Sequence, residues 1–303
     1  MRVGKALAMG FIAVSVVGLV GCGGGGADAK ITQDSVDKLG KNVAKALPGC
    51  EYNSNNVLSA RMDDDLAGAY LLLRDEVNLR KEQSPTTKLG AAVNKTENGS
   101  CGGTSSQVGT EENGAANVTY TFANYCTGDA NKKTVVDGTI TVNSVSNGSD
   151  LESVEISTGA GGVVTVATAG GSTTRQSIEL SNFKYVVGKS GQPSRITADK
   201  LRVDSGGSIY EITGQEAEIS GDVNGGTLTI KHATYRDPEV GAVTVKTTPL
   251  NFGSGASGAG VITLTGSDGS VEFKTNDMST MKFTAYLDNK PSGCIDCSKA
   301  NGN

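Results

Sequence analysis

The sequence predicts a mainly β protein in which an antiparallel meander forms a curved sheet or an open barrel, with two N-terminal amphipathic helices. Three observations predict this class. Glycine is abundant, with 42 residues, whereas aromatic residues make up only 5% and tryptophan is missing, a composition typical of short strands separated by turns. Several segments alternate apolar and polar residues, as strands with one buried face do. Asn224-Gly225 and Asp268-Gly269 adopt positive φ readily and favour hairpin turns.

Two segments near the N-terminus have helical periodicity. In residues 27–48, apolar residues recur at steps of three and four: Val36, Leu39, Val43 and Leu47. In residues 64–81, one face carries Leu66, Tyr70, Leu73 and Val77. Because an amphipathic helix must bury its apolar stripe, we expect both helices to pack on the sheet.

The strand signal begins after a long segment without periodicity. Residues 83–117 are rich in turn-forming residues and predict a surface loop pinned by Cys101. Residues 118–288 contain the strand candidates, clearest in VDGTITV (136–142), GGTLTIKH (225–232), SVEFKT (270–275) and MKFTAYL (281–287). We expect sequential strands to pair, and a phase slip between Leu180 and Phe183 predicts a bulge. A two-layer sandwich is the alternative arrangement.

The N-terminus has the pattern of an export signal. Arg2 and Lys5 precede an uncharged, mostly apolar run over residues 6–20, which is shorter than the roughly 20 residues of a spanning helix. The sequence Leu19-Val20-Gly21-Cys22 resembles the lipobox of bacterial lipoproteins. The resemblance implies cleavage before Cys22, a diacylglycerol on its thiol and, since glycine follows, export to an outer membrane where the host has one. An ordinary signal with a chance cysteine is the alternative.

This pattern gives an expected division of the chain into six parts. They are a signal peptide (1–21), a lipidated cysteine with a Gly-rich tether (22–30), a helical segment packing on the sheet (31–82), a loop (83–117), an antiparallel β domain (118–288) and a Cys-containing tail (289–303).

The charge and the cysteines restrict the environment of the protein. Removal of residues 1–21 takes away Arg2 and Lys5 and shifts the net charge from −5 to −7, which argues against nucleic-acid binding. Five cysteines follow Cys22, a usage that fits an oxidising compartment. Their spacing favours a disulfide between Cys101 and Cys126. Cys294 and Cys297 are expected in a disulfide as well, with each other or through one of them with Cys50; the sequence leaves these pairings open.

No segment has the spacing of a catalytic or metal site. His232, the only histidine, shares a strand face with Leu228 and Ile230, so we expect an inward or rim residue and no catalytic role. The spacing of Cys294 and Cys297 is that of redox motifs, but their place in a tail after the last strand favours a structural disulfide. The run Asp63-Asp64-Asp65 lacks the spacing of an EF-hand and predicts a solvated helix start. We therefore expect no metal and no cofactor.

Two further resemblances concern the body of the chain. One segment resembles uncharacterised Gly- and Thr-rich bacterial lipoproteins, which carry no known activity: Cys101-Gly102-Gly103, Val118-Thr119-Tyr120-Thr121-Phe122-Ala123-Asn124-Tyr125-Cys126 and Asp137-Gly138-Thr139-Ile140-Thr141-Val142. Another is similar to strand repeats of lipopolysaccharide-transport proteins, a likeness of strand geometry: Ile196-Thr197-Ala198-Asp199-Lys200-Leu201, Glu211-Ile212-Thr213-Gly214 and Ala217-Glu218-Ile219.

These patterns favour a lipid-anchored, non-enzymatic protein of the cell envelope that acts as a binding or structural module. Its expected partners are the membrane, through the N-terminal lipid, and an envelope protein or a lipid. The alternative is a carrier of amphiphiles with an open β groove. A third hypothesis is a thiol oxidoreductase using Cys294 and Cys297.

Overall fold

The structure is a computed structural model that describes residues 28–46, 51–54, 91–112, 114–129, 132–147, 150–189, 191–205, 207–222, 225–253, 257–276, 278 and 282–296. In these ranges the chain forms one helix, α2 (Gln33–Ala46), and a single sheet of eighteen strands. The mainly β class predicted from the sequence is confirmed, and the second layer of a sandwich is not found among the described residues.

The strands follow one another closely along the chain. Those of the first half are β1 (Glu51–Ser54), β2 (Ala91–Asn98), β3 (Gly102–Glu112), β4 (Ala115–Gly128), β5 (Lys132–Asn147), β6 (Asp150–Thr158), β7 (Val163–Ala169), β8 (Ser172–Ser181) and β9 (Phe183–Val186). Those of the second half are β10 (Ser194–Ser205), β11 (Ser208–Asp222), β12 (Gly225–Asp237), β13 (Gly241–Thr247), β14 (Leu250–Gly253), β15 (Gly260–Thr265), β16 (Ser270–Thr275), β17 (Lys282–Leu287) and β18 (Lys290–Asp296).

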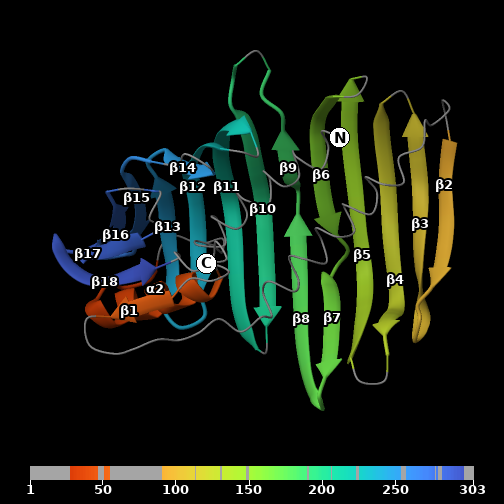
Figure 1. Cartoon of the computed structure of the whole chain (residues 1–303), viewed down its shortest axis with the longest axis horizontal. Coiled ribbons are helices and arrows are strands. Elements are labelled where there is room, and N and C mark those ends of the chain that lie inside the picture. The colour runs from red at the N-terminus through yellow and green to blue at the C-terminus, as the bar shows by residue number, and fades with distance from the viewer. Residues whose placement is uncertain are drawn as a thin grey trace.

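Every pairing is antiparallel, and most pairs join strands that are neighbours in sequence. From β2 the pairing runs through β3, β4 and β5. Strands β6 and β7 both pair with β5, and strands β8 and β9 both pair with β10. In each case two short strands, one after the other, together occupy a single position in the sheet. The meander continues to β18. Strand β1 departs from it, because this N-terminal strand pairs with β18 at the far edge. Figure 1 shows the result, an open sheet from β2 at one edge to β18 and β1 at the other.

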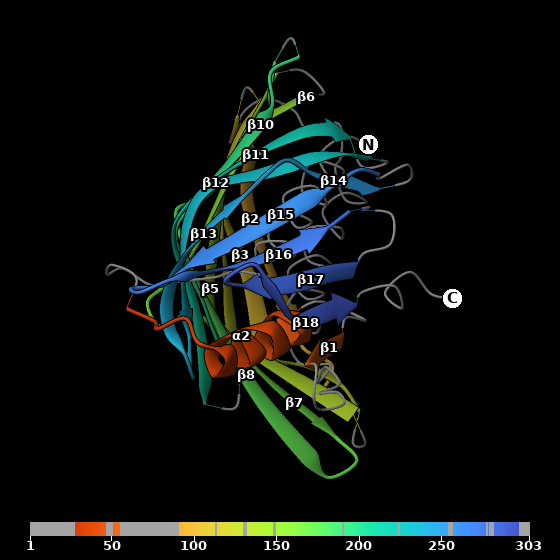
Figure 2. The same ribbon diagram turned by 90° about the vertical axis from the view of Figure 1, so that its left-hand side faces the viewer.

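The sheet is strongly curved, as Figure 2 shows. One face, called the inner face below, carries the buried apolar side chains. On β15 and β16, Ile262 lies opposite Phe273 and Leu264 opposite Val271, and all four side chains are at most 3% exposed. The buried residues of β16 are those that the apolar–polar alternation of its sequence predicts. The same holds for β17, where Phe283 and Ala285 are buried.

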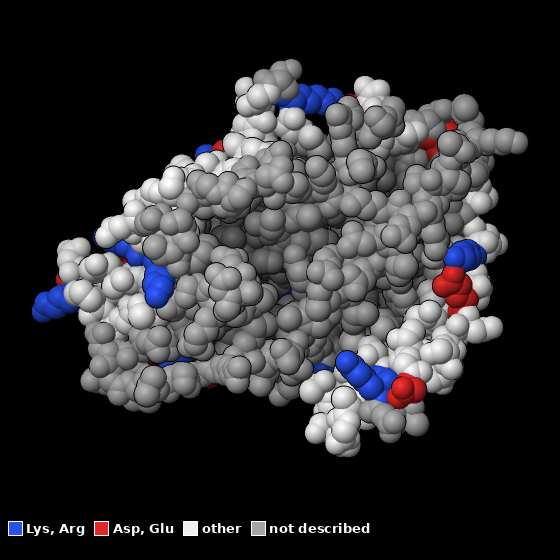
Figure 3. All heavy atoms as spheres, viewed as in Figure 1, with Lys and Arg blue, Asp and Glu red and all other residues white. Residues whose placement is uncertain are grey.

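The outer face carries charged side chains that pair across the strands. Lys184 Nζ lies 3.7 Å from Glu155 on β6, and Lys200 Nζ lies 2.9 Å from Glu179 on β8. Such exposed pairs contribute little free energy, but opposite charges on neighbouring strands favour one register over its alternatives. In the view of Figure 3 the Lys, Arg, Asp and Glu side chains of the described residues lie around the margin of the molecule.

The predicted loop over residues 83–117 is wrong, because this segment contains β2, β3 and the start of β4. Its strands have no apolar alternation to reveal them. Where β4 places Val118, Tyr120 and Phe122 on the inner face, the facing positions of β3 are Gly109, Gln107 and Ser105. Strand β2, at the edge, is exposed and polar through most of its length. Backbone pairing with β4 therefore creates these strands, without a local hydrophobic pattern.

The predicted N-terminal helices are only partly found. One helix, α2, is described, and it packs on β18, β1 and β17. Val36 and Leu39 of the predicted stripe are fully buried, whereas residues 28–32 of the first predicted helix have no regular secondary structure. The helix predicted over 64–81 lies outside the described residues. Two further differences are β1, inside the segment expected to be helical, and β18, inside the segment expected to be a tail.

The phase slip between Leu180 and Phe183 is found as a break in the strand, but the bulge predicted from it is not, because the register against β10 is the same on both sides, with Leu180 opposite Leu201 and Tyr185 opposite Ile196. Strand β8 ends at Ser181 and β9 begins at Phe183, with Asn182 between them in the left-handed region at φ 50°. The backbone N–H of Asn182 donates to Ser157 Oγ at 3.1 Å. Because the backbone turns at Asn182, Leu180 and Phe183 both reach the inner face and are buried.

Substitution Leu264→Ala should lower the free energy of unfolding by about 2–5 kcal/mol, because it removes a fully buried side chain from the inner face. Urea denaturation measures the loss. The matched control is Val108→Ala, since Val108 is 58% exposed on β3 and should change stability by less than about 0.5 kcal/mol. Equal effects of the two substitutions would contradict the assignment of the faces.

Candidate functional site: the N-terminal strap and the disulfides

The first described residues form a strap across the ends of distant strands. We define the strap as residues 28–32, which precede α2. The backbone N–H groups of Asp28 and Ala29 both donate to the carbonyl of Ala242 at the start of β13, at 3.0 and 2.9 Å. The N–H of Ser267, in the β15–β16 turn, donates to the carbonyl of Ala29 at 2.8 Å. The strap is therefore bound to two turns more than 200 residues along the chain.

Two carboxylates strengthen this contact. The N–H of Ala242 donates to the carboxylate of Asp28, and Arg236 Nη2 lies 3.3 Å from Asp28 Oδ2. The hydrogen bond from Ala242 and, after it, the charge of Arg236 hold the pKa of Asp28 below its ordinary value. On the other turn, Asp268 Oδ1 accepts from the N–H of Ile31 at 2.9 Å. Hydrogen bonds to an ionised acceptor are stronger than neutral ones, so each turn contributes one such bond.

Glycines in both turns make room for the strap. A Cβ atom at Gly266 would lie 2.1 Å from the carbonyl oxygen of Ala29. A Cβ atom at Gly241 would lie 2.7 Å from Asp28 Oδ1, and Gly241 has a φ of 101° that other residues rarely adopt. The close approach of the two backbones thus depends on the missing side chains.

Burial and helix capping fix the remainder of the strap. Ala29 and Ile31 are 1% and 8% exposed within the hydrophobic core. Thr32 caps α2: its Oγ1 accepts from the N–H of Ser35 at 3.3 Å, and Ser35 Oγ accepts in return from the N–H of Thr32 at 2.7 Å. Asp28, Ala29 and Lys30, which the sequence assigned to a tether over residues 22–30, therefore belong to the strap.

The β12–β13 turn that receives the strap is itself internally bonded. Asp237, 2% exposed, accepts from the N–H groups of Glu239 and Val240 at 2.8 and 3.0 Å. Its second oxygen accepts from the hydroxyl of Tyr235 on the same strand. This buried carboxylate has a structural use, since each contact holds the turn in shape.

The predicted disulfide between Cys101 and Cys126 is present. It joins the start of β3 to the end of β4, with the Cα atoms 5.1 Å apart and a sequence separation of 25. In the chain-entropy account a bridge closing such a loop stabilises the fold by about 3 kcal/mol. It lies near the β2 edge, where β3 contributes few apolar side chains to the inner face, and so it supplies stability where packing is weakest.

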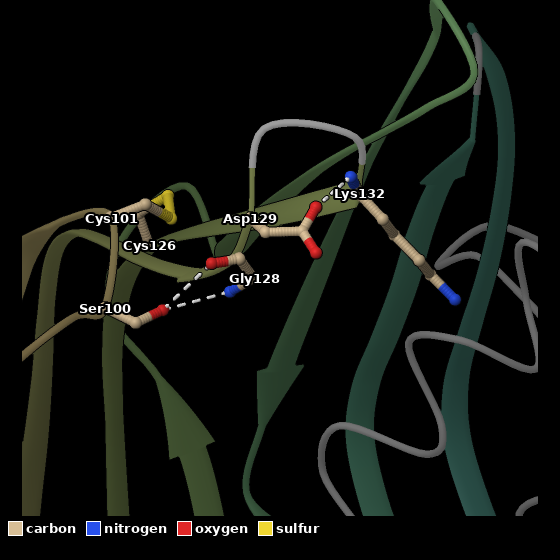
Figure 4. Close-up of a disulfide and its surroundings, with 6 residues drawn as sticks. All are labelled: Ser100, Cys101, Cys126, Gly128, Asp129 and Lys132. Atoms are coloured by element: carbon tan, nitrogen blue, oxygen red, sulfur yellow. Dashed lines mark hydrogen bonds between the residues drawn. A yellow bond between two sulfur atoms is a disulfide. The ribbon is translucent and has the colours of Figure 1, made fainter.

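Hydrogen bonds around the disulfide order the neighbouring turns, as Figure 4 shows. Ser100 Oγ accepts from the N–H of Gly128 at 3.1 Å and donates to its carbonyl at 3.2 Å. In the next turn the N–H of Lys132 donates to Asp129 Oδ1 at 3.0 Å. The side chain of Lys132 points away from the disulfide in this view.

The predicted disulfide role of Cys294 is wrong, because its thiol is free and half-buried. Cys294 lies within β18, opposite Asn53 on β1 and Thr284 on β17. Because the residues directly opposite Cys294 are Asn53 and Thr284, no cysteine is placed across from it to form a cross-strand disulfide. The sequence interpretation failed because it treated this segment as a tail instead of a strand. Cys297 and Cys50 lie outside the described residues.

His232 is exposed, whereas the sequence pattern placed it on the face of Leu228 and Ile230. The pairing of β11 with β12 changes register at this point, so that the inner-face positions pass from Ile230 to Ala233, both fully buried. His232 then lies on the outer side, with Nδ1 3.1 Å from the carbonyl oxygen of Gly214. Nothing in the sequence of β12 alone reveals the bulge, which arises from Gly214 (φ 58°) on β11.

Other expected features are outside the described residues or have no counterpart in them. Cys22, the lipobox and the run Asp63-Asp64-Asp65 lie in the undescribed ranges. Within the described ranges, no three His, Cys, Asp or Glu side chains are placed to hold a metal ion. No helix in this part of the chain is long and apolar enough to cross a membrane.

Sequence reasoning missed the strap altogether. Asp268-Gly269 was identified only as a hairpin dipeptide and Asp28 only as part of a tether. No local pattern connects two positions separated by more than 200 residues. The one available signal was the recurrence of small residues at Gly266, Ser267 and Gly269, which fits a turn without saying what contacts it.

The described fold defines a class: a single-sheet antiparallel β protein with one edge helix and an N-terminal strap. Neither a known protein family nor a curated protein nor a solved structure matches the chain.

Substitution Gly266→Ala should displace the strap and lower the free energy of unfolding by about 1–3 kcal/mol, because the new Cβ would overlap backbone. Gly269→Ala is the matched control in the same turn: its Cβ would make an ordinary 3.6 Å contact with Ile31 and should change stability by less than about 0.5 kcal/mol. Urea denaturation and amide hydrogen exchange at Asp28 and Ala29 measure both effects. Unchanged exchange at these amides in Gly266→Ala would refute the role of this contact.

Thiol titration of the unfolded, unreduced protein carrying Cys22→Ala should detect one thiol per chain, that of Cys294. In the sequence, Cys50 directly precedes β1 and Cys297 directly follows β18, and these strands pair up to Glu51 opposite Asp296. We therefore expect Cys50 and Cys297 to be oxidised to a second disulfide. Peptide mapping should find Cys50 linked to Cys297, and Cys294→Ser should leave no titratable thiol. Three thiols in the Cys22→Ala protein would disprove this pairing.

Proposed function

We propose that this protein is a lipid-anchored, non-enzymatic component of the cell envelope that serves as a binding or structural module. The observation that carries the proposal is the strap. Its first described residue, Asp28, lies six positions after the lipobox Cys22, and the strap is hydrogen-bonded to two turns of the sheet. An acyl group on Cys22 would thus be joined to the strap through only five intervening residues, 23–27.

The strap suits a chain that is held by its N-terminus. Two or three acyl chains anchor a protein stably, since each buried CH₂ contributes roughly 0.8 kcal/mol. Movement of the anchor relative to the body acts first on Asp28 and Ala29. These residues are bonded through their backbones and, at Asp28, through a carboxylate. A strap of this kind keeps α2 and the strands beneath it from being loosened by the anchor.

A structural or binding role also fits the two faces of the sheet. The inner-face side chains such as Ile196, Leu264 and Val271 are fully buried, and charges of the outer face such as Lys200 and Glu179 are paired with one another. Partners in this proposal are the membrane, through the lipid, and an envelope protein or a lipid. The excess of acidic over basic residues disfavours nucleic acid.

A carrier of amphiphiles is the second candidate. The curvature of the single sheet and its apolar inner face favour it. It ranks second because the inner-face side chains are buried, and a carrier would have to uncover them to admit an acyl chain. Mass spectrometry of gently purified protein tests this candidate by looking for co-purifying lipid.

The mature wild-type protein should begin at Cys22 and carry a mass excess equal to a diacylglycerol, with or without a further acyl chain, and it should partition into a detergent phase. Cys22→Ala should show neither property, because it lacks the thiol that accepts the lipid. The matched control Cys294→Ser should remain acylated. An uncut or unacylated wild-type chain would refute the proposal.

A further inference from the structure

We propose that one defined end of the sheet faces the lipid bilayer, an inference that rests on the acylation of Cys22 proposed above. This strap end comprises the strap itself and four turns, β10–β11 (205–208), β12–β13 (237–241), β15–β16 (265–270) and β17–β18 (287–290). The occupant of the surface is the bilayer into which the acyl chains of Cys22 insert.

The strand register places the four turns at the same end of the sheet. Strands β10 and β11 pair up to Ser205 opposite Ser208, and β12 and β13 up to Asp237 opposite Gly241. Across the sheet, Thr244 of β13 lies opposite Thr265 of β15, and the end of β17 pairs with the start of β16. The β9–β10 connection over residues 187–193, which precedes the first residue of β10, belongs to the opposite, far end.

The length of chain between the lipid and the strap limits the distance from the membrane. Six residue steps separate Cys22 from Asp28, and a fully extended chain spans at most about 20 Å over that length. A Gly-rich chain has a shorter average length, roughly 12–15 Å. Because Asp28 is bonded to Ala242, the β12–β13 turn is held within this distance of the acylated residue.

The far end lies well beyond this reach. Strand β10 extends from Ser194 at the far end to Ser205 at the strap end, which corresponds to about 36 Å of extended strand. This distance exceeds the greatest length that the six residue steps from Cys22 to Asp28 can span. The anchor therefore restrains one end of the sheet strongly and the other only through the rigidity of the fold.

The chemistry of the strap end indicates contact with lipid headgroups and not insertion. Exposed residues of its turns are mostly polar or charged, among them Glu239, Asp268, Asp288 and Lys290. The exposed large apolar side chains of the described residues are Val108, Val145 and Val186, and none of them lies in these turns. Without an exposed large apolar side chain in these turns to insert, the residues between Cys22 and Asp28 set the greatest distance of this surface from the bilayer.

Depth-dependent fluorescence quenching tests the proposal on the full acylated protein. A fluorescent non-natural residue replaces either Glu239, exposed at the strap end, or Gln192, exposed at the far end. The protein is incorporated into phosphatidylcholine vesicles containing nitroxide-headgroup lipid. Quenching should be several-fold stronger at position 239 than at 192, and insertion of a long Gly-Ser segment after Gly26 should reduce the difference. Equal quenching, or stronger quenching at 192, would overturn the proposed orientation.

The controls separate this inference from the proposed function. Mass spectrometry of each labelled sample establishes whether Cys22 is acylated, and Cys22→Ala with an ordinary signal peptide gives the quenching of unanchored protein. A wild type without an acyl group refutes the function itself. An acylated wild type with equal quenching at both positions refutes the orientation alone.

Discussion

Hydrogen bonds between the strap and two distant turns connect the beginning of the folded chain to its C-terminal half. The N–H groups of Asp28 and Ala29 share the carbonyl of Ala242, and Ser267 closes the contact from the neighbouring turn. Since α2 follows directly, these bonds also determine where the helix lies on β17, β18 and β1. The position of the helix, the burial of Val36 and Leu39 beneath it and the proposed attachment to a membrane all depend on this contact.

The sheet achieves its stability unevenly along its width. From β10 to β18 the inner face is filled by apolar side chains such as Ile230, Leu264 and Phe273, and burial of apolar surface is the main favourable contribution to folding. Towards β2 the inner positions of β3 become small or polar, and a disulfide joins β3 to β4. A covalent link and backbone pairing thus substitute for packing at an edge that has few apolar residues. The polar character of β2 also makes this exposed edge a poor template for aggregation.

The proposed function rests on the position of the strap close to Cys22 in the sequence, and not on reactive side chains. The charged side chains of the outer face pair across strands, the single histidine contacts a backbone carbonyl, and the buried carboxylate of Asp237 holds a turn. These polar groups of the described residues each have a structural partner in the fold. What distinguishes the N-terminus is the short distance along the chain between a lipidation motif and a firmly bonded strap.

The sequence by itself determined the class of fold and most of the strands, because period-two alternation in segments such as β16 and β17 is a local consequence of having one buried face. It also predicted the Cys101–Cys126 disulfide from spacing. The tertiary structure alone decided the strap, the strands β2 and β3, the free thiol of Cys294 and the exposed position of His232. Each of these depends on what lies opposite in the fold, either far along the chain, as for the strap, or on an adjacent strand, as for β3 and His232. Neither a hydrogen bond across 200 residues nor a register shift on a neighbouring strand leaves a periodic signal in the local sequence.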